Sequence, residues 1–489
     1  MKNHSRREML QLLTGAAIAS VGPISSRALD GFPEVPAQAA KGTPSIKTRM
    51  FWTWDHSTEW ALNRPGAHTM GAANEYGRST EAFVDDYTAL FHWCSHHNVD
   101  AVVLWGLLRD SHGGLDSAKR LSDIAASQGV RLLCGVGLNC YGGVYYEGDS
   151  PISLEQHLAS HPDLIALDQA GNRMNKPHQY VACPSRLENQ EFAAESLHWL
   201  FKNLPLGGVQ VETGDYTVCH CHLCKDRRKH PSSSLSWEDM ALMYPIAARA
   251  IRSVSPKAWI VCETYSHPEP YSGPKEAPGF GEGKPYWADE CLDQFPKGDG
   301  IFVQWVCDQY VQPLLQRTWT SAGTVSSVQR QNIMRSHFGT YWAGHLRGEL
   351  SIDWIADMIK RSSASGFGAI SLFGEVSPFD TGAELNYLAL ENYGSAANPN
   401  SDLELFLNKV AAPLLGGPKS AHDFLRYARL LDARSNGNAG NGGARPGTVP
   451  AEILREIYAR CGSSPADVAR RWVWLASYLA SADYPALPA

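Results

Sequence analysis

The chain of 489 residues has no excess of basic residues. Its 43 Lys and Arg are outnumbered by 50 Asp and Glu, so the formal net charge is −7. No basic stripe runs along any segment, which argues against a nucleic-acid partner. The sequence also lacks an apolar run of the roughly 18 residues that a membrane span needs, and we expect no such span. The composition, 44% hydrophobic and 19% charged, is that of an ordinary globular protein.

A disulfide framework is missing as well. The chain holds eleven cysteines, an odd number in a long sequence, which does not fit a small disulfide-stapled scaffold. Cys94, Cys134, Cys262 and Cys307 lie in apolar segments and are expected to be small buried side chains. Only the group at 219, 221 and 224 has the spacing of metal ligands.

The N-terminus has the pattern of a targeting segment. The run Ser5-Arg6-Arg7-Glu8-Met9-Leu10 resembles a twin-arginine export signal, a mildly apolar stretch follows over 12–21, and Ala37-Gln38-Ala39 is a candidate cleavage site. We therefore expect residues 1–39 to be a signal peptide and leader, and the mature protein to be periplasmic or secreted.

The rest of the chain alternates between short apolar runs and amphipathic stretches, which is typical of strands followed by helices. The predicted strands are 48–54, 100–105, 130–136, 207–211, 258–263, 300–305, 336–342 and 368–375. The predicted helices are 81–97, 115–128, 188–204, 237–254, 352–365 and 383–393. Eight such units predict an α/β fold, a (β/α)8 TIM barrel, over residues 48–395.

Two regions depart from this rhythm. Residues 139–186 are rich in Gly, Tyr, Pro and Asn and form a long insertion with a helix-like piece at 153–161, and insertions of that length in a compact domain are usually functional or disordered. Residues 404–489 are predicted to be a C-terminal helical region around a Gly/Asn-rich loop at 435–447.

Carboxylates and aromatic residues collect at the predicted strand ends. Barrel enzymes work at the C-terminal ends of their strands, and burying a carboxylate there is costly unless a site needs it. The strand ends carry Trp54, Asp55, His56, Trp105, Asn139, Tyr141, Glu212, Asp215, Glu263, Tyr265, His267, Trp305, Trp342, His345 and Glu375. Sugars suit such a mouth, because carboxylates act on the glycosidic bond and aromatic faces stack on sugar CH groups.

On these residues the chain resembles exported bacterial (β/α)8 glycoside hydrolases over about 48–415. The most specific part is Val209-Gln210-Val211-Glu212-x-x-Asp215, followed by Cys219-x-Cys221-x-x-Cys224. The segment from Gly382 through Gly416 also resembles the ending of such barrels. The predicted seventh strand carries no evident nucleophile carboxylate, which departs from the usual retaining pattern.

The resemblance implies hydrolysis of a glycosidic bond by two carboxylates, one a protonated acid and the other a nucleophile or a base acting on water. Asp215 or Glu212 is the candidate acid, and Glu375 or Glu263 the candidate second group. The expected substrate is a small carbohydrate or oligosaccharide, and no cofactor is expected to be required. The residues expected to bind substrate are Trp54, Asp55, His56, Trp105, Asn139, Tyr141, Tyr265, His267, Trp305, Trp342 and His345.

The cysteine cluster has its own prediction. Cys219, Cys221 and Cys224, completed by His222 or His220, have the ligand types of a Cys₃His zinc site, which would be structural. A disulfide or free thiols are the other possibilities.

Two other functions compete with hydrolysis of carbohydrate. The first is a metal-dependent hydrolase or isomerase with Asp55 and His56 as first-strand ligands. This function lacks the His-x-His motif expected on that strand. Asp55 and His56 are adjacent, and adjacent strand residues point to opposite faces. The second is a catalytically inert, exported carbohydrate-binding barrel.

Overall fold

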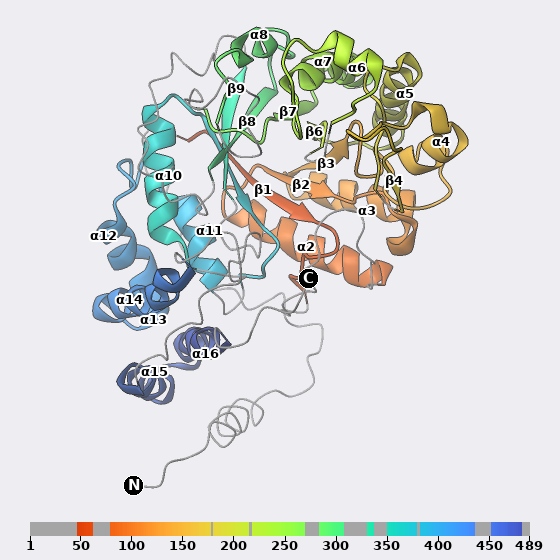
Figure 1. The fold of residues 1–489 in the computed structure, drawn as a ribbon. Coiled ribbons are helices and arrows are strands. Elements are labelled where there is room, and N and C mark those ends of the chain that lie inside the picture. The colour runs from red at the N-terminus through yellow and green to blue at the C-terminus, as the bar shows by residue number, and fades with distance from the viewer. Residues whose placement is uncertain are drawn as a thin grey trace. The chain divides into compact units, whose positions relative to one another are not determined.

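Eight parallel strands close into a barrel in which neighbours pair in the order β1-β10-β9-β8-β7-β6-β3-β2 (Figure 1). The computed structural model describes residues 46–61, 79–177, 179–214, 218–268, 283–307, 330–336, 350–378, 382–435 and 451–481. The barrel strands are β1 (Thr48–Trp54), β2 (Ala101–Trp105), β3 (Arg131–Gly137), β6 (Gly208–Glu212), β7 (Trp259–Glu263), β8 (Ile301–Cys307), β9 (Gln331–Ser336) and β10 (Ala369–Phe373). The predicted (β/α)8 fold is confirmed.

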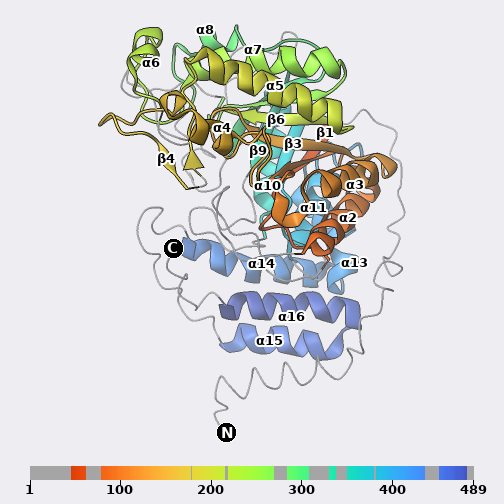
Figure 2. The same cartoon turned by 90° about the vertical axis from the view of Figure 1, so that its right-hand side faces the viewer.

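Helices follow the strands and cover the outside of the barrel (Figure 2). The main ones are α2 (Thr80–His96), α3 (Gly114–Ser127), α5 (Leu187–Asn203), α7 (Trp237–Val254), α10 (Ile352–Ala364) and α11 (Gly382–Asn392), with the short helices η1 (Asp110–His112), α6 (His222–Arg227) and α8 (Ala288–Leu292). Two helices begin at serine N-caps. The Ser79 side chain caps α2 by accepting from Ala82 N, and the Ser236 side chain caps α7 by accepting from Asp239 N. Among the described residues, no helix has the length and hydropathy of a membrane span.

Alternate side chains of each strand point into the barrel. The apolar residues that meet there are Met50, Trp52, Trp54, Ala101, Val103, Trp105, Leu133, Val261, Phe302, Ile333, Ala369 and Phe373. The same alternation turns Gln210, Glu263, Gln304 and Arg335 inward, and all four are buried. The interior is therefore largely apolar, and these four polar side chains form a group on β6, β7, β8 and β9.

The seventh barrel strand differs from its prediction. It is β9 (Gln331–Ser336), which ends where the predicted strand 336–342 begins. The aromatic residues of 337–342 suggested a strand, but the register is set by Ile333, Met334 and Arg335, which pair with Ala369, Ile370 and Ser371 of β10. The prediction failed because Arg335 is charged, and an inward charge does not look like strand sequence.

The insertion between β3 and β6 builds a small layer of its own. It contains α4 (Leu154–Ser160), η2 (Pro162–Leu164) and the ribbon of β4 (Asn175–Lys176) with β5 (Gln179–Tyr180). Its apolar residues Leu154, Leu158, Leu164, Ile165 and Ala182 pack on one another. The insertion is thus an ordered addition on the same side as the strand ends.

Helices also fill the C-terminal region. They are α12 (Leu403–Phe406), the π-helical turn η4 (Leu407–Ala411), α13 (Ala412–Leu415), α14 (Pro418–Ser435), α15 (Ala451–Ser463) and α16 (Ala466–Ser481). Arg471 of α16 holds Glu384 of α11 through two hydrogen bonds, of 2.6 and 2.8 Å. This pair ties the C-terminal helices to the last helix of the barrel. The predicted signal and leader, 1–39, lie outside the described residues.

Candidate functional site

Glu212, the last residue of β6, is a buried carboxyl with one hydrogen-bond donor. Its Oε2 accepts from the Tyr265 hydroxyl at 2.6 Å, while Oε1 is buried and has no partner in the described part of the chain. Burial raises the pKa of Glu212 to about 8, helped by the charge of Glu263 and opposed by the Tyr265 hydrogen bond and Arg335. Glu212 is therefore protonated at neutral pH and can donate a proton.

Glu263, one strand further on, has the opposite environment. It is completely buried, and its Oε2 accepts from Gln210 Nε2 at 3.2 Å and from Gln304 Nε2. The other donors to this carboxylate are Thr264 N at 3.0 Å and Tyr265 N at 2.8 Å, with Arg335 Nη1 paired at 3.2 Å. With both oxygens engaged, Glu263 fixes the chain that carries Tyr265 and is poorly placed to act as a nucleophile.

Arg335 is a residue that the sequence did not bring to the site. It is fully buried at the end of β9, and its guanidinium lies 4.9 Å from the ring centroid of Trp52 and 4.8 Å from that of Tyr265. Such cation–π contacts, together with the Glu263 pair, compensate its buried charge. The signal that could have found it is a lone Arg at an inward position of a short strand.

Tyr265 links these residues. Its backbone has a φ of +51°, a left-handed conformation that a tyrosine adopts only when its surroundings impose it. The Glu263 carboxylate accepts from Tyr265 N at 2.8 Å, and the Tyr265 hydroxyl then reaches Glu212. The site at β6 and β7 is thus a connected chain from Arg335 through Glu263 and Tyr265 to the Glu212 acid.

Asp55, after β1, forms a second charged site on another part of the barrel. Its Oδ2 accepts from Arg109 Nε at 2.7 Å, and His112 Nε2 lies 3.6 Å away. Burial alone would raise the pKa of Asp55, but Arg109, His112 and His56 hold it well below its ordinary value. Gly106, with a φ of +84°, makes room for the Asp55 carboxyl group, because a Cβ at position 106 would lie 2.4 Å from it.

His56 lies beside Asp55, not on the opposite face as predicted. His56 Nδ1 is 3.3 Å from Asp55 Oδ1. Both residues belong to a turn just beyond β1, where the alternation of a strand no longer holds. His56 therefore contributes to keeping Asp55 ionised.

Aromatic side chains fill the space around the ends of β1 to β3. Trp54 stacks on Trp105 at 5.4 Å between centroids and meets the edges of Tyr141 at 5.8 Å and Tyr146 at 6.2 Å. All four are buried, and burial together with the nearby Glu212 raises the pKa of Tyr146. Tyr141 also has a positive φ, +52°. The predicted residues Trp54, Trp105 and Tyr141 are thus brought together in one aromatic cluster.

Glu375 follows β10 and is completely buried. Its Oε1 accepts from the backbone N–H of Trp54 at 2.7 Å, which joins the last barrel strand to the first. Glu375 therefore lies next to the aromatic cluster.

Two predicted substrate contacts have other partners. Trp305 donates from Nε1 to Asn332 Oδ1 at 3.0 Å and packs on Trp237 of α7, 6.0 Å away, so its indole faces the helix layer. His267 Nδ1 is 2.7 Å from the Val306 carbonyl. Trp305 points outward because Gln304, its neighbour on β8, takes the inward position.

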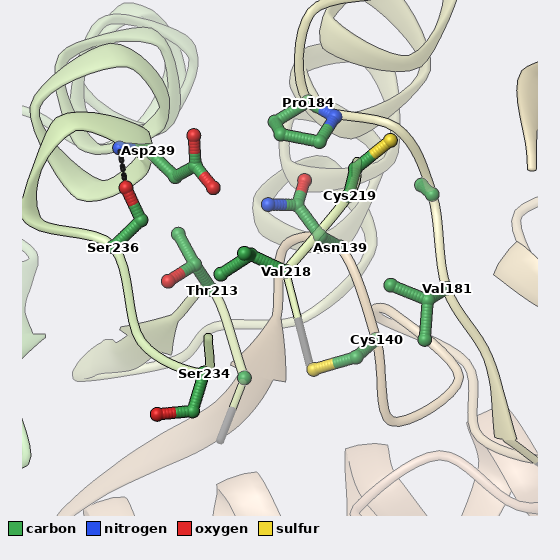
Figure 3. A pocket seen from close by; sticks show the side chains of 12 residues that line it. Asn139, Cys140, Val181, Pro184, Thr213, Val218, Cys219, Ser234, Ser236 and Asp239 are labelled. Carbon is green, nitrogen blue, oxygen red and sulfur yellow. Dashed lines mark hydrogen bonds between the residues drawn. The ribbon is translucent and has the colours of Figure 1, made fainter. Parts of the chain in front are cut away.

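Asn139 lines a pocket at the ends of β3 and β6 (Figure 3). The other lining residues are Cys140, Val181, Ala182, Pro184, Thr213, Gly214, Val218, Cys219, Ser234, Ser236 and Asp239. Asn139 Oδ1 is buried and accepts no hydrogen bond from the described residues. Gly214 (φ +98°) passes so close to Cys140 that a Cβ would lie 2.3 Å from its sulfur. The pocket therefore begins at Thr213, the residue after Glu212.

The cysteines of the loop after β6 converge, as predicted. Cys219, Cys221 and Cys224 lie with Cys183 so that the four sulfur atoms are all within 4.8 Å of one another. His222 is not in this group: its side chain is exposed, because Cys221 and Cys224 are three residues apart on one side of α6 and His222 projects from another. Cys183, from the insertion, was missed.

Three of the predicted site residues, Asp215, Trp342 and His345, lie outside the described residues.

No family model matches the chain, and the search of curated proteins gives no match. Among solved structures, the chain is similar to a glycoside hydrolase family 20 β-N-acetylglucosaminidase: 13% identity, 77% of this chain and 76% of that chain, TM-score 0.43. It is also similar to a GH138 enzyme targeting pectin rhamnogalacturonan II: 13% identity, 80% and 44% of the two chains, TM-score 0.45. An α-amylase from Lactobacillus plantarum matches with 11% identity, 68% and 72% coverage and a TM-score of 0.39. At these values the similarities assign no substrate and no catalytic residue to this chain.

Proposed function

We propose that the protein is a glycoside hydrolase and that Glu212 is its general acid. The observation that carries the proposal is a buried carboxyl at a barrel strand end whose pKa is raised to about 8, so that it holds its proton at neutral pH. In the reaction, the Glu212 O–H gives its proton to the glycosidic oxygen as the bond from that oxygen to the anomeric carbon breaks. The leaving group departs as a neutral alcohol.

The neighbouring residues support this role by position and charge. Tyr265 donates to Glu212 Oε2 and so aims the remaining oxygen, while Glu263 and Arg335 hold Tyr265 from its backbone and its ring. We therefore assign Glu263 as a positioning residue. Its four hydrogen-bond donors and the Arg335 ion pair occupy both carboxylate oxygens and leave it little capacity for attack on a sugar.

The second carboxylate of the mechanism is Glu375 or Asp215. It would either attack the anomeric carbon or take a proton from the water that does so. Glu375 is buried beside Trp54 and accepts a hydrogen bond from the Trp54 backbone N–H. Asp215 follows Glu212 by three residues in the sequence. The aromatic residues Trp54, Trp105 and Tyr141 supply apolar faces of the kind that stack on sugars.

The competing metal-dependent function has less support at the first strand. Asp55 is held by Arg109 in an ion pair of 2.7 Å and so already has a cationic partner. Within the described ranges, the one converging group of three or more metal-ligating side chains is the cysteine group. Export through the twin-arginine signal at residues 5–10 remains part of the proposal, with a carbohydrate outside the cytoplasm as substrate.

The test compares Glu212→Gln with the wild-type protein on a panel of aryl glycosides. For substrates with poor leaving groups, kcat/KM should fall by about 10²–10⁴-fold, the usual contribution of a general acid. For activated leaving groups that depart without a proton, the loss should be much smaller. Glu188→Gln, an exposed glutamate at the start of α5, is the matched control and should keep full activity.

Three results would count against the proposal. Equal losses on both substrate types would make Glu212 a binding residue. Full activity of Glu212→Gln would place the acid elsewhere. A wild-type protein that binds sugars but hydrolyses none of the glycosides would favour the inert binding barrel.

A further inference from the structure

Four cysteine sulfurs from three separate places in the sequence meet at one point. Cys183 belongs to the insertion, Cys219 and Cys221 to the loop after β6, and Cys224 to α6. Cys183 Sγ is 3.6 Å from Cys221 Sγ and 3.5 Å from Cys224 Sγ, and all four sulfurs are within 4.8 Å of one another. Packing of four small apolar side chains does not require such convergence of the sulfur atoms themselves.

The spacing of the sulfurs fits one tetrahedral metal ion. With zinc–sulfur bonds near 2.3 Å, the sulfurs of a tetrahedral site are about 3.8 Å apart. A disulfide needs about 2.05 Å, and Cys183 lies at nearly equal distances from two partners, which pairing with either one would not produce. All four cysteines are free thiols in the structure.

The surroundings suit thiolates. Leu167 N donates to Cys219 Sγ at 3.4 Å, and the Ser185 hydroxyl lies 3.1 Å from Cys224 Sγ. Arg228 Nη1 donates to the Cys219 carbonyl at 2.8 Å, which brings a cation next to the cluster. Such outer contacts orient ligands and offset the negative charge of a four-thiolate site.

The cluster also forms part of a buried apolar layer. Cys183, Cys219 and Cys224 pack with Ala166 and Val181. Three of the four cysteines are buried and Cys221 is half-buried, and four protein ligands leave no open position for a substrate. A site of this type is structural rather than catalytic.

We infer that Cys183, Cys219, Cys221 and Cys224 bind one structural zinc ion that fastens the insertion to the loop after β6. The inference goes beyond the proposed hydrolase function and replaces the Cys₃His set with Cys₄. Its consequence lies in the pocket. Val181, Ala182 and Pro184 flank Cys183, and Cys219 lies beside Pro184 on the same part of the pocket wall (Figure 3). Zinc would therefore hold the insertion and the loop after β6 together in one wall of the pocket that begins beside Glu212.

The first test is the metal content of the purified full chain, measured by elemental analysis after expression in zinc-supplemented medium. We expect one zinc per chain, released when the thiols are modified with a mercurial and detected by a zinc-binding dye. Cobalt exchanged into the wild-type protein should give the intense sulfur-to-metal charge-transfer absorption of four thiolates. This measurement needs no variant to fold.

Variants then separate the ligand sets. Cys183→Ser should lose the zinc and have a lower melting temperature, whereas His222→Ala should keep the zinc and the wild-type melting temperature. Cys461→Ser, a half-buried cysteine of α15 outside the cluster, is the matched control. Zinc lost in His222→Ala but kept in Cys183→Ser would restore the Cys₃His set. A metal-free protein with fewer titratable thiols on denaturation would mean that the cysteines form disulfides. Bound iron would mean that the cluster holds iron and not zinc. Each result would overturn the inference.

Discussion

Asp55 and Glu212 are two buried carboxyl groups at strand ends of one barrel, yet they have opposite protonation. Both are at most 1% exposed. Asp55 has a guanidinium at 2.7 Å and two histidines near it, so its pKa lies well below the ordinary range. Glu212 has a single neutral donor, and a second carboxylate nearby, so its pKa is raised to about 8.

The difference shows that burial alone does not set the charge of a carboxyl group. Burial penalises the charged form at both sites, and the partner decides the outcome. Arg109 repays the cost of burying Asp55, whereas Arg335 is already paired with Glu263 and repays only part of the cost for Glu212. One barrel mouth thus holds both an ionised and a protonated carboxyl group in the same fold.

The largest expected effect is on stability at the Asp55 site. Arg109→Met leaves the Asp55 carboxylate buried without its main cation, and this should lower the free energy of unfolding by about 3–5 kcal/mol. At about pH 4.5, where the unfolded chain also holds much of this proton, Glu212→Gln replaces one neutral group by another and should change the free energy of unfolding by less than about 1 kcal/mol. Urea unfolding of both variants measures the contrast.

Glu147→Gln is the control for this comparison. Glu147 also pairs with Arg109, at 3.0 Å, but its side chain is 34% exposed. Its loss should cost about 1 kcal/mol or less. If Arg109→Met were as stable as Glu147→Gln, Asp55 would not depend on its ion pair, and the contrast between the two sites would fail.

The change in stability per pH unit is expected to be smaller than the loss at the Asp55 site. The folded-state pKa of Glu212 is raised from 4.5 to about 8, so between these values the folded protein holds a proton that the unfolded chain releases. The stabilising contribution is complete below the lower value and is lost as the pH rises through about 8. Within the window, stability should fall by up to about 1.4 kcal/mol per pH unit.

The measurement is the difference in the free energy of unfolding between the wild-type protein and Glu212→Gln at each pH. Other groups titrate in both proteins, so their contributions cancel. Asp55 has the opposite sign, but its contribution is lost only as the pH falls below the ordinary range of an aspartate, outside this window. A difference that stays flat from pH 5 to pH 8 would show that Glu212 is not proton-linked to folding.

Much of the fold could be predicted from the sequence because its signals are local. Seven of the eight strands lie where apolar runs such as 101–105 and 259–263 place them. The exception is β9, where Arg335 replaces the expected inward apolar residue. The stabilisation of Arg335 by Trp52, Tyr265 and Glu263 is tertiary, and none of these neighbours is close to it in the sequence.

The site was predicted in part for the same reason. Glu212, Glu263 and Asp55 follow from their places at strand ends, but their roles do not, because a role depends on which donors surround each carboxylate. Cys183 could not be assigned to the metal group, since it lies 36 residues before Cys219 within an irregular insertion. Its position depends on how that insertion folds back over the end of β6.

The central claim is that Glu212 carries a proton at neutral pH. Infrared spectroscopy tests it directly, with the C=O stretch of the protonated carboxyl taken as the difference between the wild-type protein and Glu212→Gln. The band should be present at neutral pH and disappear with a midpoint near the pKa of about 8. A band that is absent at neutral pH, with a midpoint near the ordinary glutamate value, would show that Glu212 is ionised and cannot be the acid.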